Sequence, residues 1–208
     1  MSATAAPALS DRSDFRTVTT GGAAVGLLTA VAVVAFLAAS RLLPDVGGVR
    51  GGVESLIVLA AGIAVAFLPA QRTGARGVDG IAGAAAVGLV GTVVFSAIDI
   101  VLLRPFKAYP WTWDAIGGGS TWWYLPVWWM LGTFAAWMGA IVTARAATPD
   151  VSSPPPLVRR ALPLVAATVI AVTVVRLAGL RVALPVLTGG AFTLALAALA
   201  LVALARKR

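Results

Sequence analysis

Six long apolar runs account for most of the sequence, and most of the charged residues lie in the short segments between these runs or at the two ends of the chain. Each run has about the length that a helix needs to cross the ~30 Å hydrocarbon core of a bilayer, roughly 17–25 residues. This pattern predicts an all-α integral membrane protein with about six transmembrane helices and short loops. The predicted spans cover approximately residues 21–43, 53–70, 79–103, 122–146, 160–178 and 182–205.

The predicted membrane domain occupies residues 21–205, between two polar ends. Residues 1–20 are polar and of mixed charge, and we expect them to form an N-terminal tail. Residues 206–208 form a short basic C-terminal tail. The first apolar run is longer than the apolar region of a typical signal peptide, so we expect it to be retained as a helix.

The positive charges are distributed in a way that predicts the orientation of the chain. The chain carries a net charge of +8, but its Lys and Arg residues flank apolar runs, so membrane topology explains them better than nucleic-acid binding. Ten of the sixteen fall on the side that holds both termini. These ten are Arg12, Arg16, Arg72, Arg76, Arg145, Arg159, Arg160, Arg206, Lys207 and Arg208. The bias predicts that both termini are cytoplasmic.

The composition also indicates the kind of organism and membrane. Most of the basic residues are arginines, and alanine, glycine and valine are abundant, which is typical of GC-rich bacterial genomes. We therefore expect a multi-pass protein of the bacterial cytoplasmic (inner) membrane.

The chain has no cysteine and no histidine. This excludes disulfides, cysteine-ligated metals, iron–sulfur clusters, histidine-ligated haem or metals, and acid–base chemistry that uses histidine. The sequence also shows no recognisable catalytic constellation. We therefore predict no enzymatic activity, no catalytic residue, no metal site and no cofactor, although a bound lipid or another hydrophobic ligand is compatible with the sequence.

Six of the seven tryptophans lie between Tyr109 and Trp129. Tryptophan and tyrosine concentrate at membrane interfaces, which explains the rings before and at the start of the fourth span. It does not explain Trp137, which lies near the middle of that span. Two interpretations remain open: simple anchoring, or a surface that contacts a protein or a hydrophobic ligand. The predicted surface consists of Trp122, Trp123, Trp129, Met130, Phe134 and Trp137.

Small residues occupy another face of the same span. Gly132, Ala136 and Gly139 follow one another at spacings of four and three residues, so they share one side of a helix. Small residues let helix backbones approach closely in membranes. We call these three residues the small-residue seam and expect it to pack against other helices.

One carboxylate qualifies as intramembrane by its position, and it is Asp99, about one turn inside the end of the third span. It shares a helix face with Thr92 and Ser96, which suggests a site that handles a proton or a cation. The structural alternative is an ion pair with Arg176, near the end of the fifth span, or with Arg104 or Lys107. Arg176 alone could instead extend to the lipid headgroups.

These features favour a non-catalytic subunit that packs into a larger membrane assembly through the small-residue seam and the tryptophan-rich surface. The expected partners are membrane lipids and other membrane proteins, and nucleic acid is not expected. The alternative is a small-solute transport component or a membrane protein that binds a hydrophobic ligand. Six spans in about 200 residues with both ends inside are similar, in size and topology, to the S-components of energy-coupling-factor transporters.

Overall fold

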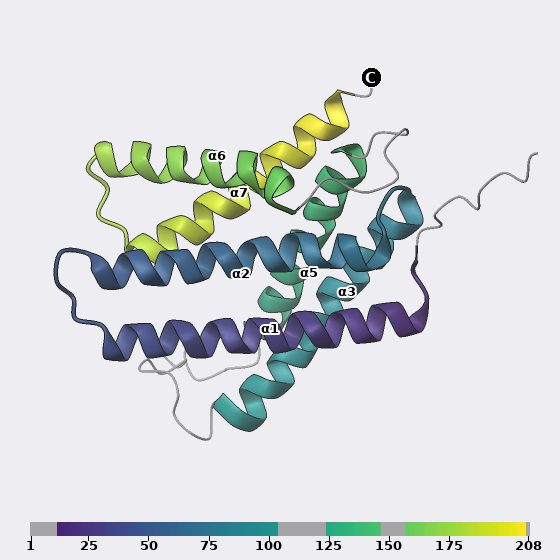
Figure 1. Cartoon of the computed structure of the whole chain (residues 1–208), viewed down its shortest axis with the longest axis horizontal. Helices are drawn as coiled ribbons and strands as arrows, with labels where there is room; N and C mark the ends of the chain where they lie inside the picture. Colours follow the sequence, from purple (N-terminus) through teal and green to yellow (C-terminus); the bar gives the residue numbers. More distant parts are fainter. Residues whose placement is uncertain (1–11, 104–123, 147–156, 207–208) are drawn as a thin grey trace, which may run out of the picture.

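The computed structural model describes residues 12–103, 124–146 and 157–206, which form helices and contain no β-strand (Figure 1). Six of the helices are long and apolar enough to cross a membrane, as the sequence predicted. The elements are α1 (Phe15–Leu42), α2 (Val49–Thr73), α3 (Val78–Ile98), the π-helical turn η1 (Asp99–Leu103), α5 (Tyr124–Ala146), α6 (Leu157–Leu177) and α7 (Leu184–Ala205).

Helix α1 begins at Phe15, earlier than the predicted start at residue 21. The Asp14 carboxylate caps this helix: it accepts hydrogen bonds from the backbone N–H of Thr17 at 3.0 Å and from the Thr17 hydroxyl at 2.7 Å. Such a cap satisfies a backbone donor that has no partner inside the helix. Residues 15–20, which hydropathy assigned to the tail, therefore belong to the helix.

Helix α2 extends beyond the predicted span, residues 53–70, at both ends. It starts after Gly48, whose φ is +77°, and it stops at Gly74, whose φ is +61°. Glycine adopts these left-handed conformations without the steric cost that a Cβ would add. The two glycines therefore determine where α2 begins and ends.

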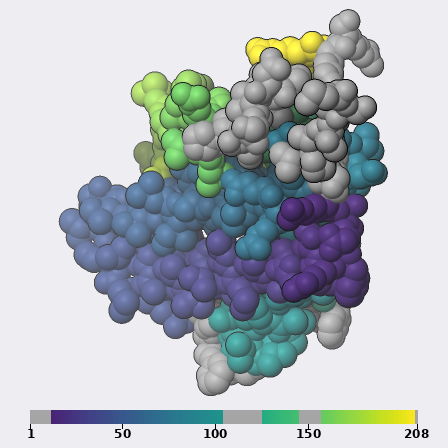
Figure 2. All heavy atoms as spheres, turned by 45° about the vertical axis from the view of Figure 1, so that its right-hand side comes forward, coloured from purple at the N-terminus to yellow at the C-terminus, as the bar shows by residue number. Residues whose placement is uncertain are grey.

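Helix α2 is the centre of the bundle, because it contacts all five of the other long helices. It lies antiparallel to α1, and α3 and α5 cross this pair obliquely (Figure 1). In the space-filling view, α1 and α2 form a broad layer, with the C-terminal part of α3 below it and α6 above it (Figure 2). We call the end of the bundle where α1 begins and where α2 and α7 end the termini end (Figure 1).

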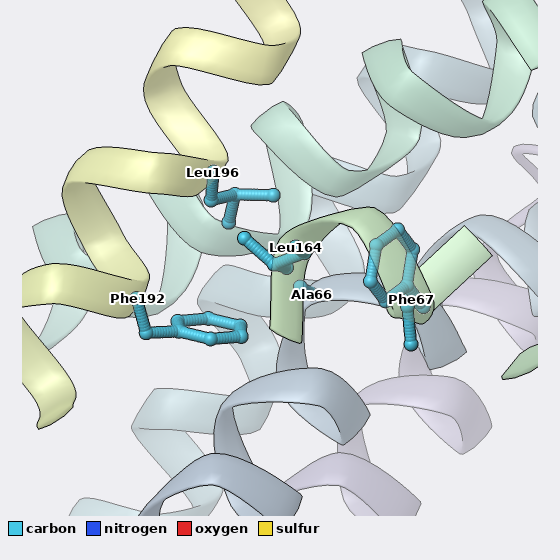
Figure 3. Packing of buried hydrophobic residues seen from close by; sticks show 6 residues of the cluster. Ala66, Phe67, Leu164, Phe192 and Leu196 are labelled. Carbon is cyan, nitrogen blue, oxygen red and sulfur yellow. The ribbon is translucent and has the colours of Figure 1, made fainter. Parts of the chain in front are cut away.

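The main apolar cluster joins α2, α6 and α7. It comprises Ala66, Phe67, Ala161, Leu164, Phe192 and Leu196, all of them buried. Phe192 and Leu196 point from α7 toward Leu164 and Ala66 (Figure 3). A second cluster of Ala70, Ala75, Ala84 and Ala140 packs α2 against α3 and α5. In a bilayer, close van der Waals contact of this kind holds helices together, since lipid tails are as apolar as leucine.

Candidate functional site

The small-residue seam of α5 packs against helices of the same chain. A Cβ added at Gly132 would collide with the Thr92 side chain of α3, and one added at Gly139 would collide with the backbone carbonyl of Ala66 in α2. Ala136 is fully buried and lies opposite Gly88 of α3. Because only glycine leaves this space, the seam sets how closely α5 approaches α2 and α3.

Trp129 lies at the interface between α5 and α3. Its side chain is half-buried, and its indole N–H donates to the Ser96 hydroxyl at 3.3 Å. That hydroxyl in turn donates to the backbone carbonyl of Thr92 at 2.8 Å. The ring that we predicted to form part of an outer surface therefore contacts another helix of the same chain.

Trp128 also belongs to this interface, and the sequence analysis did not select it. Its ring meets Phe95 of α3 edge to face, with the ring centroids 6.1 Å apart and an interplanar angle of 68°. Such aromatic pairs add about 0.5–1.5 kcal/mol beyond the area that they bury. Trp128 precedes Gly132 by four residues, so the spacing of the seam places it on the same helix face.

The opposite face of α5 is exposed. Met130 is 72% exposed and Trp137 is 47% exposed, and their spacing of seven residues, about two turns, puts them on one side of the helix. Phe134 lies between them and is half-buried. Val127 and Leu131 are also exposed on this side. We call these five residues the Met130–Trp137 face; the predicted residues Trp122 and Trp123 lie outside the described residues.

Asp99 is buried, with 2% of its surface exposed, and it starts the π-helical turn η1. Turns of this kind are rare and often occur at functional sites. Ser96 and Thr92 lie before it, but their hydroxyls donate to backbone carbonyls of their own helix. These two hydroxyls, which share a helix face with Asp99, therefore donate to the helix backbone.

Arg176 lies in the last turn of α6 and is exposed. The structure does not bring it together with Asp99. Helix α6 packs mainly on α7, whereas α3 packs on α1, α2 and α5. The end of α3 lies below α1 and the corresponding end of α6 lies above α2, so the α1–α2 pair separates them (Figure 1). The other predicted partners, Arg104 and Lys107, lie outside the described residues.

Glu54 is a second buried carboxylate, which the sequence analysis did not select. It is 8% exposed and accepts a hydrogen bond from the Ser40 hydroxyl of α1 at 2.6 Å. The guanidinium of Arg50 lies 3.9 Å from the same carboxylate and pairs with Asp45 at 2.6 Å. Arg50 and Glu54 are four residues apart in the sequence, and this spacing could have predicted an ion pair on one face of a helix.

Comparison with known proteins identifies no relative of this chain. No protein-family model, no curated protein and no solved structure matches the chain. Its function is therefore inferred from its own residues and their contacts.

Proposed function

We propose that the chain is a non-catalytic subunit of a larger membrane protein assembly. We further propose that it resides in a bacterial cytoplasmic membrane, with both termini in the cytoplasm. The observation that supports the subunit role is the division of α5 into two faces. Its small-residue seam packs on α2 and α3, while the Met130–Trp137 face remains exposed.

The position of Trp137 favours a protein over lipid as the neighbour of this face. Trp137 lies near the middle of α5, and no hydrogen-bond partner of its indole occurs among residues 12–103, 124–146 and 157–206. Lipid tails offer no acceptor for an indole N–H, and tryptophan normally places that group at the membrane interface. A partner helix can supply an acceptor from a side chain or an exposed carbonyl.

We propose that the partner protein contacts only the Met130–Trp137 face. The sequence analysis also assigned the seam to assembly, but Gly132, Ala136 and Gly139 are already covered by helices of this chain. Tryptophan is enriched at interface hot spots, and methionine adapts its shape to a partner surface. Both residue types thus fit a face that packs on another protein.

The test compares native complexes of the wild type and a double variant. Met130→Ala with Trp137→Ala is expected to remove a stoichiometric partner that the wild type retains when it is purified from native membranes in mild detergent. Leu194→Ala is a matched control, because Leu194 is 73% exposed on α7. Native mass spectrometry of all three proteins gives the readout. A wild type that purifies without any partner, or a double variant that retains it, would contradict the proposal.

A transport component is the second candidate, and the buried Asp99 at a π-helical turn favours it. Ionisable groups inside membranes often serve ion or proton pathways. On this proposal, Asp99→Asn abolishes proton-coupled solute uptake by cells that depend on the protein. Uptake by the variant that equals uptake by the wild type removes Asp99 from the mechanism.

A further inference from the structure

Two buried polar groups in α5 and α6 have no hydrogen-bond partner. One is Nε of Arg160, in the first turn of α6, and the other is the hydroxyl of Thr143, near the end of α5. Each residue is only 5% exposed. Among the buried side-chain nitrogen and oxygen atoms of the described residues, only these two lack a partner. Buried polar groups normally have partners, so these two atoms call for an explanation.

Each of the two groups lies one helical turn from a residue that packs on the same part of α2. Gly139 abuts Ala66, and Thr143 follows Gly139 by one turn. Leu164 packs in one cluster with Ala66 and Phe67, and Arg160 precedes Leu164 by one turn (Figure 3). Thr143 in α5 and Arg160 in α6 therefore each lie one turn away from a residue that packs on the same part of α2.

The directions of the helices show that both displacements point the same way. Helices α2 and α5 run toward the termini end, whereas α6 runs away from it (Figure 1). A step of one turn from Gly139 toward the C-terminus of α5 therefore leads toward the termini end. A step of one turn from Leu164 toward the N-terminus of α6 leads in the same direction. Arg160 and Thr143 thus both lie on the termini side of the residues that pack on Ala66 and Phe67 of α2.

The chemistry of these groups favours an anion that carries several oxygen atoms. A guanidinium keeps its positive charge, and its fork of N–H donors matches the oxygens of phosphate. The Thr143 hydroxyl adds a neutral donor, and the N-terminus of α6 adds backbone N–H groups and a favourable dipole. The two ion pairs that join described residues to one another both involve Arg50, so no described carboxylate forms an ion pair with Arg160.

We propose that Arg160 and Thr143 face each other on the termini side of the main apolar cluster and together form a binding site for a phosphate group. Arg160 lies in the first turn of a helix long enough to span the membrane, which is the depth of phospholipid headgroups. The phosphate comes from a phospholipid headgroup or from soluble inorganic phosphate, and the experiment separates these sources. The site is independent of the Met130–Trp137 face, so it stands apart from the proposed assembly role.

The neighbouring residue Arg159 supplies a matched control. It carries the same charge in the same turn of α6 but is exposed. If only general attraction of anions by positive charge is involved, Arg159→Gln and Arg160→Gln should weaken binding equally. If Arg160 forms a specific phosphate site, only Arg160→Gln should weaken binding strongly.

The experiment titrates the full chain in detergent with short-chain phosphatidylglycerol and follows thermal unfolding, since a ligand of the folded state raises the unfolding midpoint. Loss of a charge-assisted hydrogen bond predicts that Arg160→Gln raises the apparent Kd at least about tenfold. Thr143→Val should raise it severalfold, and Arg159→Gln should leave it nearly unchanged. Short-chain diacylglycerol, which has no phosphate, should give no saturable response.

A parallel titration with sodium phosphate against sodium chloride at equal ionic strength separates the two sources. A response to the phospholipid alone that Arg160→Gln removes assigns the site to a headgroup, whereas an equal response to phosphate assigns it to the free ion. Equal responses of Arg159→Gln and Arg160→Gln, or an equal response to diacylglycerol, overturn the proposal. If Arg160→Gln does not fold, Arg160→Lys replaces the fork by a single donor group, and an unchanged Kd in that variant also overturns it.

Discussion

The indole N–H of Trp129 donates to the hydroxyl oxygen of Ser96 across 3.3 Å, which joins α5 to α3 by a side-chain hydrogen bond. Directly beside it, Trp128 meets Phe95 edge to face. Two adjacent, half-buried tryptophans therefore pack against α3, while Trp137 on the same helix is exposed.

Trp129→Phe keeps an aromatic ring and removes only the donor. Hydrogen bonds between transmembrane helices contribute about 0.6 kcal/mol on average, so we expect a loss of this order in the free energy of unfolding. Ser96→Ala should cost a similar amount, and the double variant should cost no more than either single one. Unfolding in SDS measures all three, with Trp137→Phe as a control that should not change stability. Fully additive losses would contradict the hydrogen bond.

Gly139→Ala should destabilise the bundle, because the added Cβ would meet the carbonyl of Ala66 and push α5 away from α2. Overpacking of this kind typically costs about 1–3 kcal/mol. Gly190→Ala is the matched control, since a Cβ there meets no atom within 4 Å. The control should be neutral or gain up to about 1 kcal/mol from helix propensity. SDS unfolding of both variants decides between these outcomes, and a neutral Gly139→Ala would contradict the close contact.

Ser40→Ala should destabilise the contact between α1 and α2. The hydroxyl of Ser40 donates to the buried Glu54 carboxylate at 2.6 Å, and its removal leaves part of this charge without a donor. The expected loss in the free energy of unfolding is about 1–3 kcal/mol. Ser55→Ala is the control, because the Ser55 hydroxyl donates only to a carbonyl of its own helix. Equal losses in the free energy of unfolding would show that the hydrogen bond to Glu54 contributes no more to stability than a hydroxyl that bonds to its own helix.

The start of α1 should depend on pH. The hydroxyl and the backbone N–H of Thr17 hold the pKa of Asp14 below its ordinary value of 3.8. Because the folded-state pKa is lowered, the cap contributes fully above the ordinary value, and its contribution is lost as the pH falls through the lowered pKa. Relative to the wild type, Asp14→Ala should therefore speed hydrogen exchange of the Thr17 amide at about pH 7, and this difference should shrink as the pH falls through the lowered pKa.

Asp14→Asn is the control for this pH dependence, because asparagine also caps helices but does not titrate. The protection of the Thr17 amide against exchange in this variant should therefore be the same at neutral and at acidic pH. Exchange in Asp14→Ala that equals exchange in the wild type at about pH 7 would contradict the cap.

The helix ends illustrate where hydropathy alone was insufficient. Residues 15–20 are too polar to be assigned to a span, yet they continue α1 because Asp14 caps it and because Thr19 and Thr20 donate to carbonyls one turn earlier. Hydropathy reports the apolar section of a helix, whereas local hydrogen bonds determine where its backbone begins.

The side-chain partners illustrate a different limit. The periodicity of α5 placed Gly132 and Gly139 on one face, but it did not indicate that Thr92 and Ala66 would cover them. In the same way, Arg160 counts as a flanking positive charge in the sequence, whereas the structure buries it. Which residue from a distant segment covers a given face depends on the packing of the whole bundle.

The sequence by itself determined that the chain is all-helical, that it has six segments able to cross a membrane, and that α5 has two unlike faces. Segment length, apolar composition and helical period are local properties, so no distant contact is needed to interpret them. Only the tertiary structure decided that Trp129 bonds to Ser96 and that Glu54 joins Ser40. It also decided that the end of α3, near Asp99, and the end of α6, which carries Arg176, lie on opposite sides of the α1–α2 pair (Figure 1). The physical reason is that helices in a bilayer select their neighbours by shape and by hydrogen bonds, and hydropathy, which is similar for all six, carries no information about either.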